Sequence, residues 1–131
     1  MYLLWAEPAN PVTGDNPLVE KSDTSITGYH AHVYYEENSK DRAENLRTAI
    51  ENKFTVTMGR RHDKPVGPHP RWMYQVAFGT EIFAEFIPWL ALNRDNLVVL
   101  VHPLTGDDVA DHRDFAMWLG EKLDLNLDVL K

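Results

Sequence analysis

Strand-like and helix-like hydrophobic periodicities follow one another along this chain in an order that few folds can accommodate. Alternation and buried apolar runs favour strands, whereas apolar residues three and four positions apart favour helices. The predicted elements are a strand over 28–35, a helix over 39–54, strands over 54–60 and 71–79, a helix over 80–94, bent or broken near Pro88, and a strand over 96–102. This order, β-α-β-β-α-β, predicts an α+β fold of the ferredoxin-like type, an antiparallel sheet with helices on one face.

Both ends of the chain add to this unit. Residues 1–25 read as an irregular N-terminal arm punctuated by proline and glycine, and residues 26–131 as a single domain, because 131 residues suffice for one proper core. After the fourth strand we expect a third helix over 107–123, opened by Asp107 or Asp108, and a short extra strand within 123–130.

Two histidines stand two positions apart in the first strand, in the stretch GYHAHVYY. Side chains two apart on a strand share a face and lie roughly 6.6 Å apart along it, so His30 and His32 form a short bidentate unit for a metal ion. In the ferredoxin-like arrangement the fourth strand runs antiparallel beside the first, which brings His102 near His30. The alternative is that His32 packs in the sheet while His30 is exposed at its edge.

Two further histidines lie outside the strands. Prolines on both sides of His69, in PVGPHP, fix the backbone, which suits a catalytic group that must be pre-positioned. This loop enters the third strand from the far end of the sheet, so His69 must fold back, or reach a partner subunit, to meet His30. His112 has helical spacing with apolar residues, where a structural histidine is the simpler interpretation.

The sequence leaves open whether a carboxylate joins the metal site. An iron site of the two-histidine, one-carboxylate kind needs one, and Glu36, Glu85 and Asp111 are candidates. Three or four histidines without an acid would suit zinc, iron or copper.

Composition argues against several classes of function. A net charge of −7 is unfavourable for a surface that follows nucleic-acid phosphates. The absence of cysteine removes disulfides, thiolate metal sites and a cysteine nucleophile, and leaves a cytoplasmic location as the expectation. No apolar stretch approaches the ~18 residues of a membrane span, so we expect neither a nucleic-acid nor a membrane partner.

The strands over 71–79 and 96–102 are largely apolar on both faces. Helices on one side of the sheet leave its other side in water unless something covers it. A homodimer that packs sheet to sheet would cover this open face and would line a cavity with histidine and aromatic rings. The N-terminal arm or the third helix is the alternative cover.

Six stretches of the chain resemble, in order, the DOPA 4,5-dioxygenase family of small fungal and bacterial proteins. They are YHAHVYY, AENLRTAI, PVGPHP, PWLALNR, VLVHPLTGDDVADH and WLGEKLDLNLDVL. The similarity runs from about Gly28 to Leu130. By motif position the family's characteristic histidines are His30, His32, His69, His102 and His112.

This resemblance implies an extradiol dioxygenase that opens a catechol such as L-DOPA with O₂ and a histidine-bound non-haem Fe(II), in a ferredoxin-like domain commonly paired as a homodimer. The roles assigned under this hypothesis are His30, His32 and His102 as metal ligands, His69 and His112 as acid and base, and Tyr34, Trp72 and Tyr74 as contacts to the catechol. Two other functions remain open. One is a non-catalytic dimeric module that binds a metal or a small aromatic ligand in the histidine cleft, and the other is zinc-assisted hydrolysis.

Overall fold

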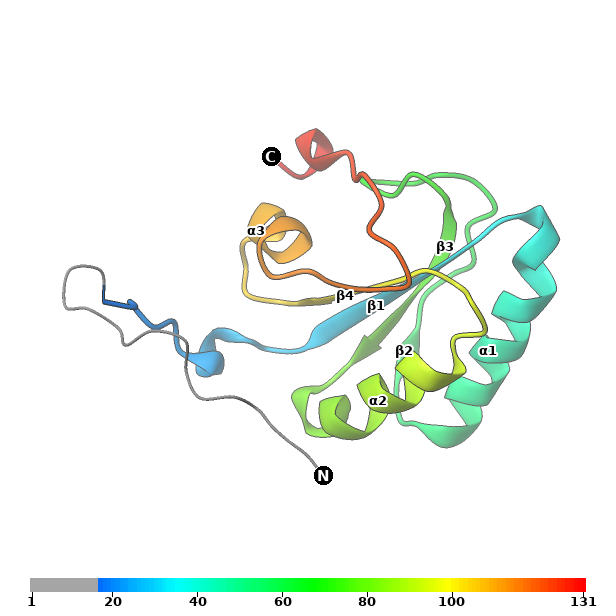
Figure 1. The fold of residues 1–131 in the computed structure, drawn as a ribbon, viewed down its shortest axis with the longest axis horizontal. Coiled ribbons are helices and arrows are strands. Elements are labelled where there is room, and N and C mark those ends of the chain that lie inside the picture. The colour runs from blue at the N-terminus through cyan, green and yellow to red at the C-terminus, as the bar shows by residue number, and fades with distance from the viewer. Residues whose placement is uncertain (1–16) are drawn as a thin grey trace, which may run out of the picture.

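The computed structural model describes residues 17–131 and shows one sheet of five strands with helices on both sides (Figure 1). The strands are β1 (Tyr29–Tyr35), β2 (Thr57–Met58), β3 (Trp72–Phe78), β4 (Val99–Pro103) and β5 (Met117–Leu119). The helices are α1 (Lys40–Lys53), α2 (Phe83–Asn93) and α3 (Asp108–Arg113), with 3₁₀ turns at Asp23–Ser25, Glu37–Ser39, Thr80–Ile82 and Leu127–Leu130.

The strand order is β2-β3-β1-β4-β5, and every neighbouring pair is antiparallel. The first four strands therefore have the ferredoxin-like arrangement, with β1 and β3 central. The register sets His30 opposite His102 on β4 and His32 opposite Gln75 on β3. The predicted α+β fold class is confirmed, although β2 is much shorter than the predicted strand over 54–60.

One face of the sheet packs against α1 and α2 and holds the larger core, which we call the helix face. Helix α1 buries Ala43, Leu46 and Ile50 at the predicted helical spacing. Helix α2 buries Phe86 and Leu90, and it continues through Pro88, which the sequence predicted would bend or break it. Each fully buried large side chain contributes about 1.5–3 kcal/mol, so this face supplies most of the hydrophobic stabilisation.

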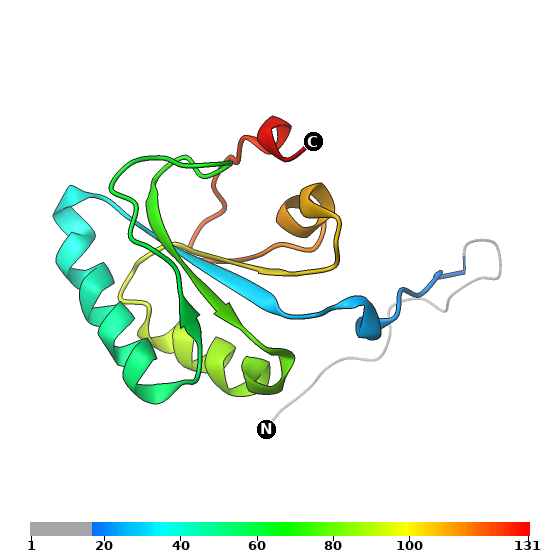
Figure 2. The ribbon, with the colours of Figure 1, turned by 180° about the vertical axis from the view of Figure 1, so that it is seen from behind.

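The opposite face, which we call the histidine face, is covered by the chain itself. The loop between β2 and β3, helix α3 and the segment after α3 lie over it (Figures 1 and 2). They build a second, smaller core from Tyr34, Met73, Val98, Leu100 and Leu123, with Val66, Ala116, Trp118 and Leu125 packed against it. Of the two covers considered for this face, the homodimer is therefore not needed, and the third helix, the alternative, is part of the observed cover. The homodimer itself stays a prediction.

The third helix ends ten residues earlier than the predicted 107–123. Asp107 caps it, since its carboxylate accepts a 3.0 Å hydrogen bond from the Ala110 amide. The amides of Asp114 and Phe115 both donate to the Ala110 carbonyl, which closes the helix. The chain then forms β5 along the edge of β4, so the extra strand lies at Met117–Leu119 and not within 123–130. Pairing the open edge of β4 outweighs the helical periodicity of this segment.

The N-terminal arm falls mostly outside the described residues. Residues 17–25 contain no regular element except the turn at Asp23–Ser25. The division into an arm over 1–25 and a domain over 26–131 stays a prediction, because residues 1–16 lie outside the described part. Between residues 17 and 131, no helix has the length and apolar character needed to cross a bilayer.

Candidate active site

Strand β1 directs His30, His32 and Tyr34 to the histidine face, as its alternation predicted. His102 lies directly across from His30 on β4. One ring nitrogen from each of His30, His32 and His102 lies within 4.8 Å of the others. The Nε2 atoms of His32 and His102 are 3.1 Å apart, within the roughly 2.8–3.6 Å that separates two nitrogens on one metal ion with bonds of about 2.0–2.2 Å.

His69 reaches the same place because its loop folds back over the histidine face. The loop turns at Gly67, where φ is +55°, and the His69 amide donates to the Val66 carbonyl at 3.0 Å. The Pro68 carbonyl accepts from the Asn126 amide at 2.9 Å, which ties the loop to the C-terminal segment. The His69 ring then lies 4.2 Å from that of His32, centroid to centroid. The topology alone predicted that the His69 loop lies far from His30. The folded-back loop brings His69 to the histidine cluster within one chain, without a partner subunit.

His112 joins the cluster from α3. Its ring centroid is 4.0 Å from that of His102, and a second group of ring nitrogens within 4.8 Å of one another comes from His32, His69 and His112. Asp111 anchors the turn that leads into α3, since its carboxylate accepts from the amide and the hydroxyl of Thr105 at 3.0 and 2.6 Å. The interpretation of His112 as a simple core histidine is therefore not supported.

Backbone carbonyls fix the proton position of two of these rings. Nδ1 of His102 lies 2.9 Å from the Pro103 carbonyl, and Nδ1 of His112 lies 2.7 Å from the Asp108 carbonyl. A carbonyl only accepts, so each Nδ1 must carry the proton, and each Nε2 is left with a free lone pair. This arrangement is typical of histidines that ligate a metal through Nε2.

His32 has the polar atom that is hardest to explain without a ligand. The residue is 2% exposed, and its Nδ1 has no hydrogen-bond partner among the described residues. Because Nε2 of His102 holds a lone pair, Nε2 of His32 donates to it, and the orphan Nδ1 is then an unused lone pair. A metal ion between the two Nε2 atoms would take the lone pairs of both and would move the His32 proton to Nδ1, so Nδ1 is not itself the ligand atom. The residues present thus fit a metal ion.

Burial favours the neutral form of His30, His32, His69 and His102. Burial first, and then the neighbouring histidines His69 and His102, hold the pKa of His32 well below 6.5. Burial likewise lowers the pKa of His69 to about 3 and that of His102 to about 4, and it lowers the pKa of the half-buried His30. Neutral imidazole is the form that binds a metal, so the site does not need to lose protons at neutral pH.

No carboxylate belongs to either three-histidine group in the described part of the chain. Glu36 is exposed and faces Arg71 at 3.8 Å. Glu85 is exposed on α2, which packs on the helix face. The carboxylate of Asp111 is occupied by Thr105. The structure therefore favours an all-histidine site over the two-histidine, one-carboxylate kind.

Two of the three aromatic residues expected at the ligand lie on the wrong face. The register places Trp72 and Tyr74 with the helix-face residues, where the Tyr74 hydroxyl donates to the Ala43 carbonyl at 2.8 Å. The expectation that they contact a ligand beside the histidines is therefore corrected. Tyr34 does lie on the histidine face, with its hydroxyl 2.6 Å from Nδ1 of His69.

Gln75 is a residue of the histidine face that the sequence reasoning missed. It is half-buried, stands opposite His32 on β3, and has no side-chain hydrogen bond recorded within residues 17–131. The sequence does contain a sign of its role, because Gln75 is the polar residue in an otherwise apolar strand. The strand register also places its side chain on the same face of the sheet as His32. The half-buried His30 and His112 leave this side of the cluster the more open one, whereas His32, His69 and His102 are buried.

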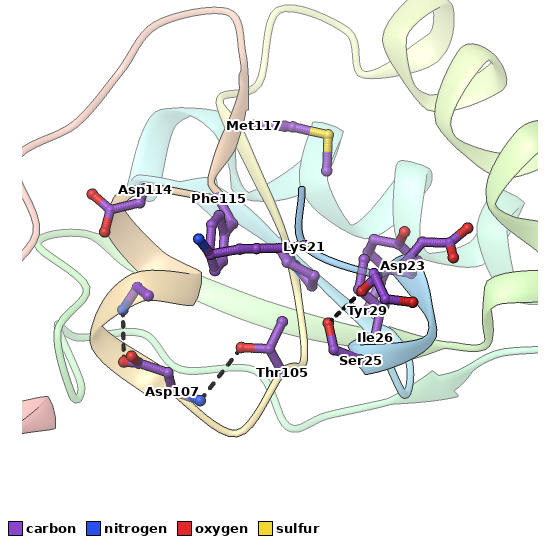
Figure 3. A pocket seen from close by; sticks show the side chains of 13 residues that line it. Lys21, Asp23, Ser25, Ile26, Tyr29, Thr105, Asp107, Asp114, Phe115 and Met117 are labelled. Atoms are coloured by element: carbon purple, nitrogen blue, oxygen red, sulfur yellow. Dashed lines mark hydrogen bonds between the residues drawn. The ribbon is translucent and has the colours of Figure 1, made fainter. Parts of the chain in front are cut away.

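An apolar groove of about 940 Å³ lies between the segment that precedes β1 and the segment around α3. Figure 3 shows Ile26 and Tyr29 on one side of it and Phe115 and Met117 on the other. None of the five clustered histidines lines the groove. It is therefore a separate feature and not the ligand side of the cluster.

The chain matches the family model described as "Dopa 4,5-dioxygenase family" over residues 29–129. It is 34% identical to a protein of Amanita muscaria described as DOPA 4,5-dioxygenase, and the match covers 80% of this chain and 50% of that protein. It is also 36% identical to an uncharacterised 21.2 kDa protein of Botryotinia fuckeliana, over 93% of this chain and 76% of that one.

A solved structure has the same fold. The crystal structure of a protein from Nostoc punctiforme, described as a "putative dioxygenase", matches with a TM-score of 0.84 and 48% sequence identity. The match covers 85% of this chain and 96% of the Nostoc protein. The match therefore spans nearly the whole of that protein.

Proposed function

This chain belongs to the Dopa 4,5-dioxygenase family, as its motifs predicted, and we propose that it is an extradiol dioxygenase that opens a catechol such as L-DOPA with O₂. The family is one of dioxygenases, which agrees with the predicted enzyme class. The observation that carries the proposal is the pair of three-histidine groups that share His32 on a buried and neutral face.

In this proposal His30, His32 and His102 hold non-haem Fe(II). The 3.1 Å separation of the Nε2 atoms of His32 and His102, and the fixed lone pair on Nε2 of His102, support this assignment. When bound, ferrous iron supplies Lewis acidity toward the catechol hydroxyls and one-electron chemistry toward O₂. The absence of a carboxylate ligand leaves the site with the full charge of the metal, which favours two anionic oxygen ligands from the substrate.

His69 and His112 provide the proton transfers. Nε2 of His112 has a fixed lone pair and can accept a proton from a catechol hydroxyl. His69 lies against His32 on the other side of the cluster, and its Nε2 is the atom at which we place the proton that is returned during ring opening. Gln75 faces the same site and offers an amide for hydrogen bonds to the catechol or its side chain.

The test is O₂ uptake by anaerobically Fe(II)-loaded protein, followed together with absorbance for a yellow ring-opened product. We expect one O₂ consumed per L-DOPA or 4-methylcatechol opened. Resorcinol, whose hydroxyls are not adjacent and cannot chelate one ion, is the matched control and should give no uptake. The metal-free protein is the second control.

If stoichiometric iron binds at the histidines but no catechol drives O₂ uptake, the catalytic proposal fails. The alternative of a module that binds a metal or a small aromatic ligand without turnover would then take its place. Hydrolysis with zinc and no O₂ uptake would instead indicate the other metal chemistry.

A further inference from the structure

Tyr34 is buried in the core of the histidine face, and its hydroxyl forms a hydrogen bond with His69. The residue is 1% exposed, and its ring stacks on Trp118 with centroids 6.0 Å apart. Its hydroxyl lies 2.6 Å from Nδ1 of His69, and this is the hydrogen bond recorded for the His69 ring within residues 17–131. A phenol enclosed in this way is poorly placed to contact a substrate directly.

We infer that Tyr34 is a positioning residue, which holds the His69 ring in one orientation and directs Nε2 of His69 into the site. The backbone of the His69 loop is already fixed by the Val66 carbonyl and by the Asn126 amide. Those bonds leave the side-chain torsions of His69 free, so the Tyr34 hydroxyl is the contact that selects the direction of the ring.

The chemistry of the partner distinguishes His69 from the other clustered histidines. Nδ1 of His102 and of His112 meets a carbonyl, which only accepts, so those two rings keep a fixed proton. A phenol hydroxyl donates or accepts, so Tyr34 donates to Nδ1 of His69 in one tautomer and accepts from it in the other. The hydroxyl of Tyr34 can therefore hold the ring of His69 in the same orientation in either tautomer.

The core of the histidine face also fixes the position of the Tyr34 ring. The packing of the ring against Leu100, Val98 and Leu123 holds the hydroxyl in place. The hydrogen bond thus rests on a rigid support.

The variant Tyr34→Phe tests this role, because it removes the hydroxyl and keeps the ring. The direct readout is the ¹⁵N NMR signature of the His69 ring in the metal-free protein, assigned by its loss in His69→Ala. We expect the Nδ1 resonance of His69 to carry the shift of a hydrogen bond to a phenol in the wild type and to lose that shift in Tyr34→Phe. An identical His69 signature in both proteins would overturn the inference.

The kinetic effect rests on the proposed function. We expect kcat for catechol opening to fall roughly 10–100-fold in Tyr34→Phe, with KM and iron stoichiometry nearly unchanged. In a His69→Ala background the same change should have almost no effect on kcat, whereas a merely structural role would lower it again. Equal losses in both backgrounds would overturn the inference.

Tyr35→Phe is the matched control, because Tyr35 is the next residue and its hydroxyl donates to Asp63 at 2.8 Å on the helix face. It should leave kcat and the His69 signature unchanged. If the wild type opens no catechol, the proposed function fails, and the NMR comparison still decides the role of Tyr34.

Discussion

The two faces of β1 carry different kinds of side chain, although both belong to the same seven-residue strand. Ala31, Val33 and Tyr35 face the helices and are 0, 0 and 3% exposed within a continuous apolar core. The intervening His30 and His32 meet three other rings of the same kind on the histidine face. The comparison indicates that burial of apolar side chains on the helix face stabilises the fold and offsets the unfavourable burial of polar rings on the histidine face.

The kind of buried polar group also differs between the two faces. On the helix face the Tyr74 hydroxyl donates to the Ala43 carbonyl, and Nη2 of the buried Arg47 donates to the Gly59 carbonyl while the guanidinium lies 5.0 Å from the centre of the Tyr74 ring. Both faces keep buried atoms without a partner among residues 17–131, namely Nε and Nη1 of Arg47 and Nδ1 of His32. The histidine face differs because its polar groups are neutral imidazoles whose ring nitrogens lie close enough together to share a metal ion.

The largest effect we expect comes from His32→Ala, because His32 belongs to both three-histidine groups. Fe(II) affinity should fall roughly a thousandfold, since about a third of the metal-binding free energy is lost. The free energy of unfolding of the metal-free protein should change little, because the lost packing is offset by removal of an unpartnered polar atom. Iron titration and chemical denaturation measure the two quantities.

His62→Ala is the matched control for His32→Ala, since His62 belongs to neither group. It should leave the iron affinity within a factor of about two to three. Equal losses in the two variants would contradict the division of roles between the faces.

Phe86→Ala should have the opposite effect to His32→Ala, with a large loss of stability and no loss of iron affinity. Phe86 is fully buried on α2 between Phe54 and Phe78, so its truncation should lower the free energy of unfolding by about 3–5 kcal/mol. Iron affinity of the protein that remains folded should be unchanged. Leu92→Ala, at an 86% exposed position of the same helix, is the control and should have almost no effect on stability. A loss of iron affinity in Phe86→Ala would show that the two faces are not separable.

Leu123→Ala should have a smaller and local effect. Leu123 is 8% exposed and packs in the core of the histidine face, so we expect a loss of about 2 kcal/mol. The opening should concentrate where the C-terminal segment meets the His69 loop, and hydrogen exchange of the Asn126 amide, which donates to the Pro68 carbonyl, reports it. Faster exchange spread evenly over β1 would argue against a local role.

Acid should weaken the histidine face by a step that, for each single histidine, is the smallest we predict. Burial places the pKa of His69 at about 3 and of His102 at about 4, below the 6.5 of the unfolded chain. Between pH 6.5 and about 4 the unfolded chain binds more protons, so the free energy of unfolding falls as the pH is lowered through this window. From pH 7.5 to 5.5 the loss should be roughly 1 kcal/mol for each such histidine.

The variant His102→Asn separates this effect from general acid denaturation. Asparagine can still donate to the Pro103 carbonyl but does not titrate. Denaturation of the metal-free protein at several pH values should give a shallower pH dependence for His102→Asn than for the wild type. Parallel curves would show that His102 does not contribute to the acid sensitivity.

Periodicity and topology were sufficient to predict the framework of the site. The alternation in β1 placed His30 and His32 on one face, and the ferredoxin-like strand order placed His102 beside them. Both follow from short-range rules, because strand parity and antiparallel pairing leave little choice of register once one face is apolar.

The remaining features depend on contacts that no local pattern reveals. The loop that carries His69 folds back over the sheet and is held there by a hydrogen bond from the Asn126 amide to the Pro68 carbonyl. These two residues lie 58 positions apart in the chain. The early end of α3 follows from the open edge of β4, which competes for the same residues. Trp72 and Tyr74 were assigned to the site because they are aromatic. Their positions in β3, opposite Tyr35 and Val33, place their side chains on the helix face. That error was avoidable from the sequence.

The central claim is that the histidine face binds a metal through His32 and its neighbours. The most direct test is a crystal structure of the anaerobically Fe(II)-loaded protein, with anomalous scattering measured at the iron edge. The account predicts one strong peak within about 2.2 Å of ring nitrogens of His32 and of two further clustered histidines, with no carboxylate in contact. A peak away from His32, or no peak at the histidines in protein that carries one equivalent of iron, would contradict it.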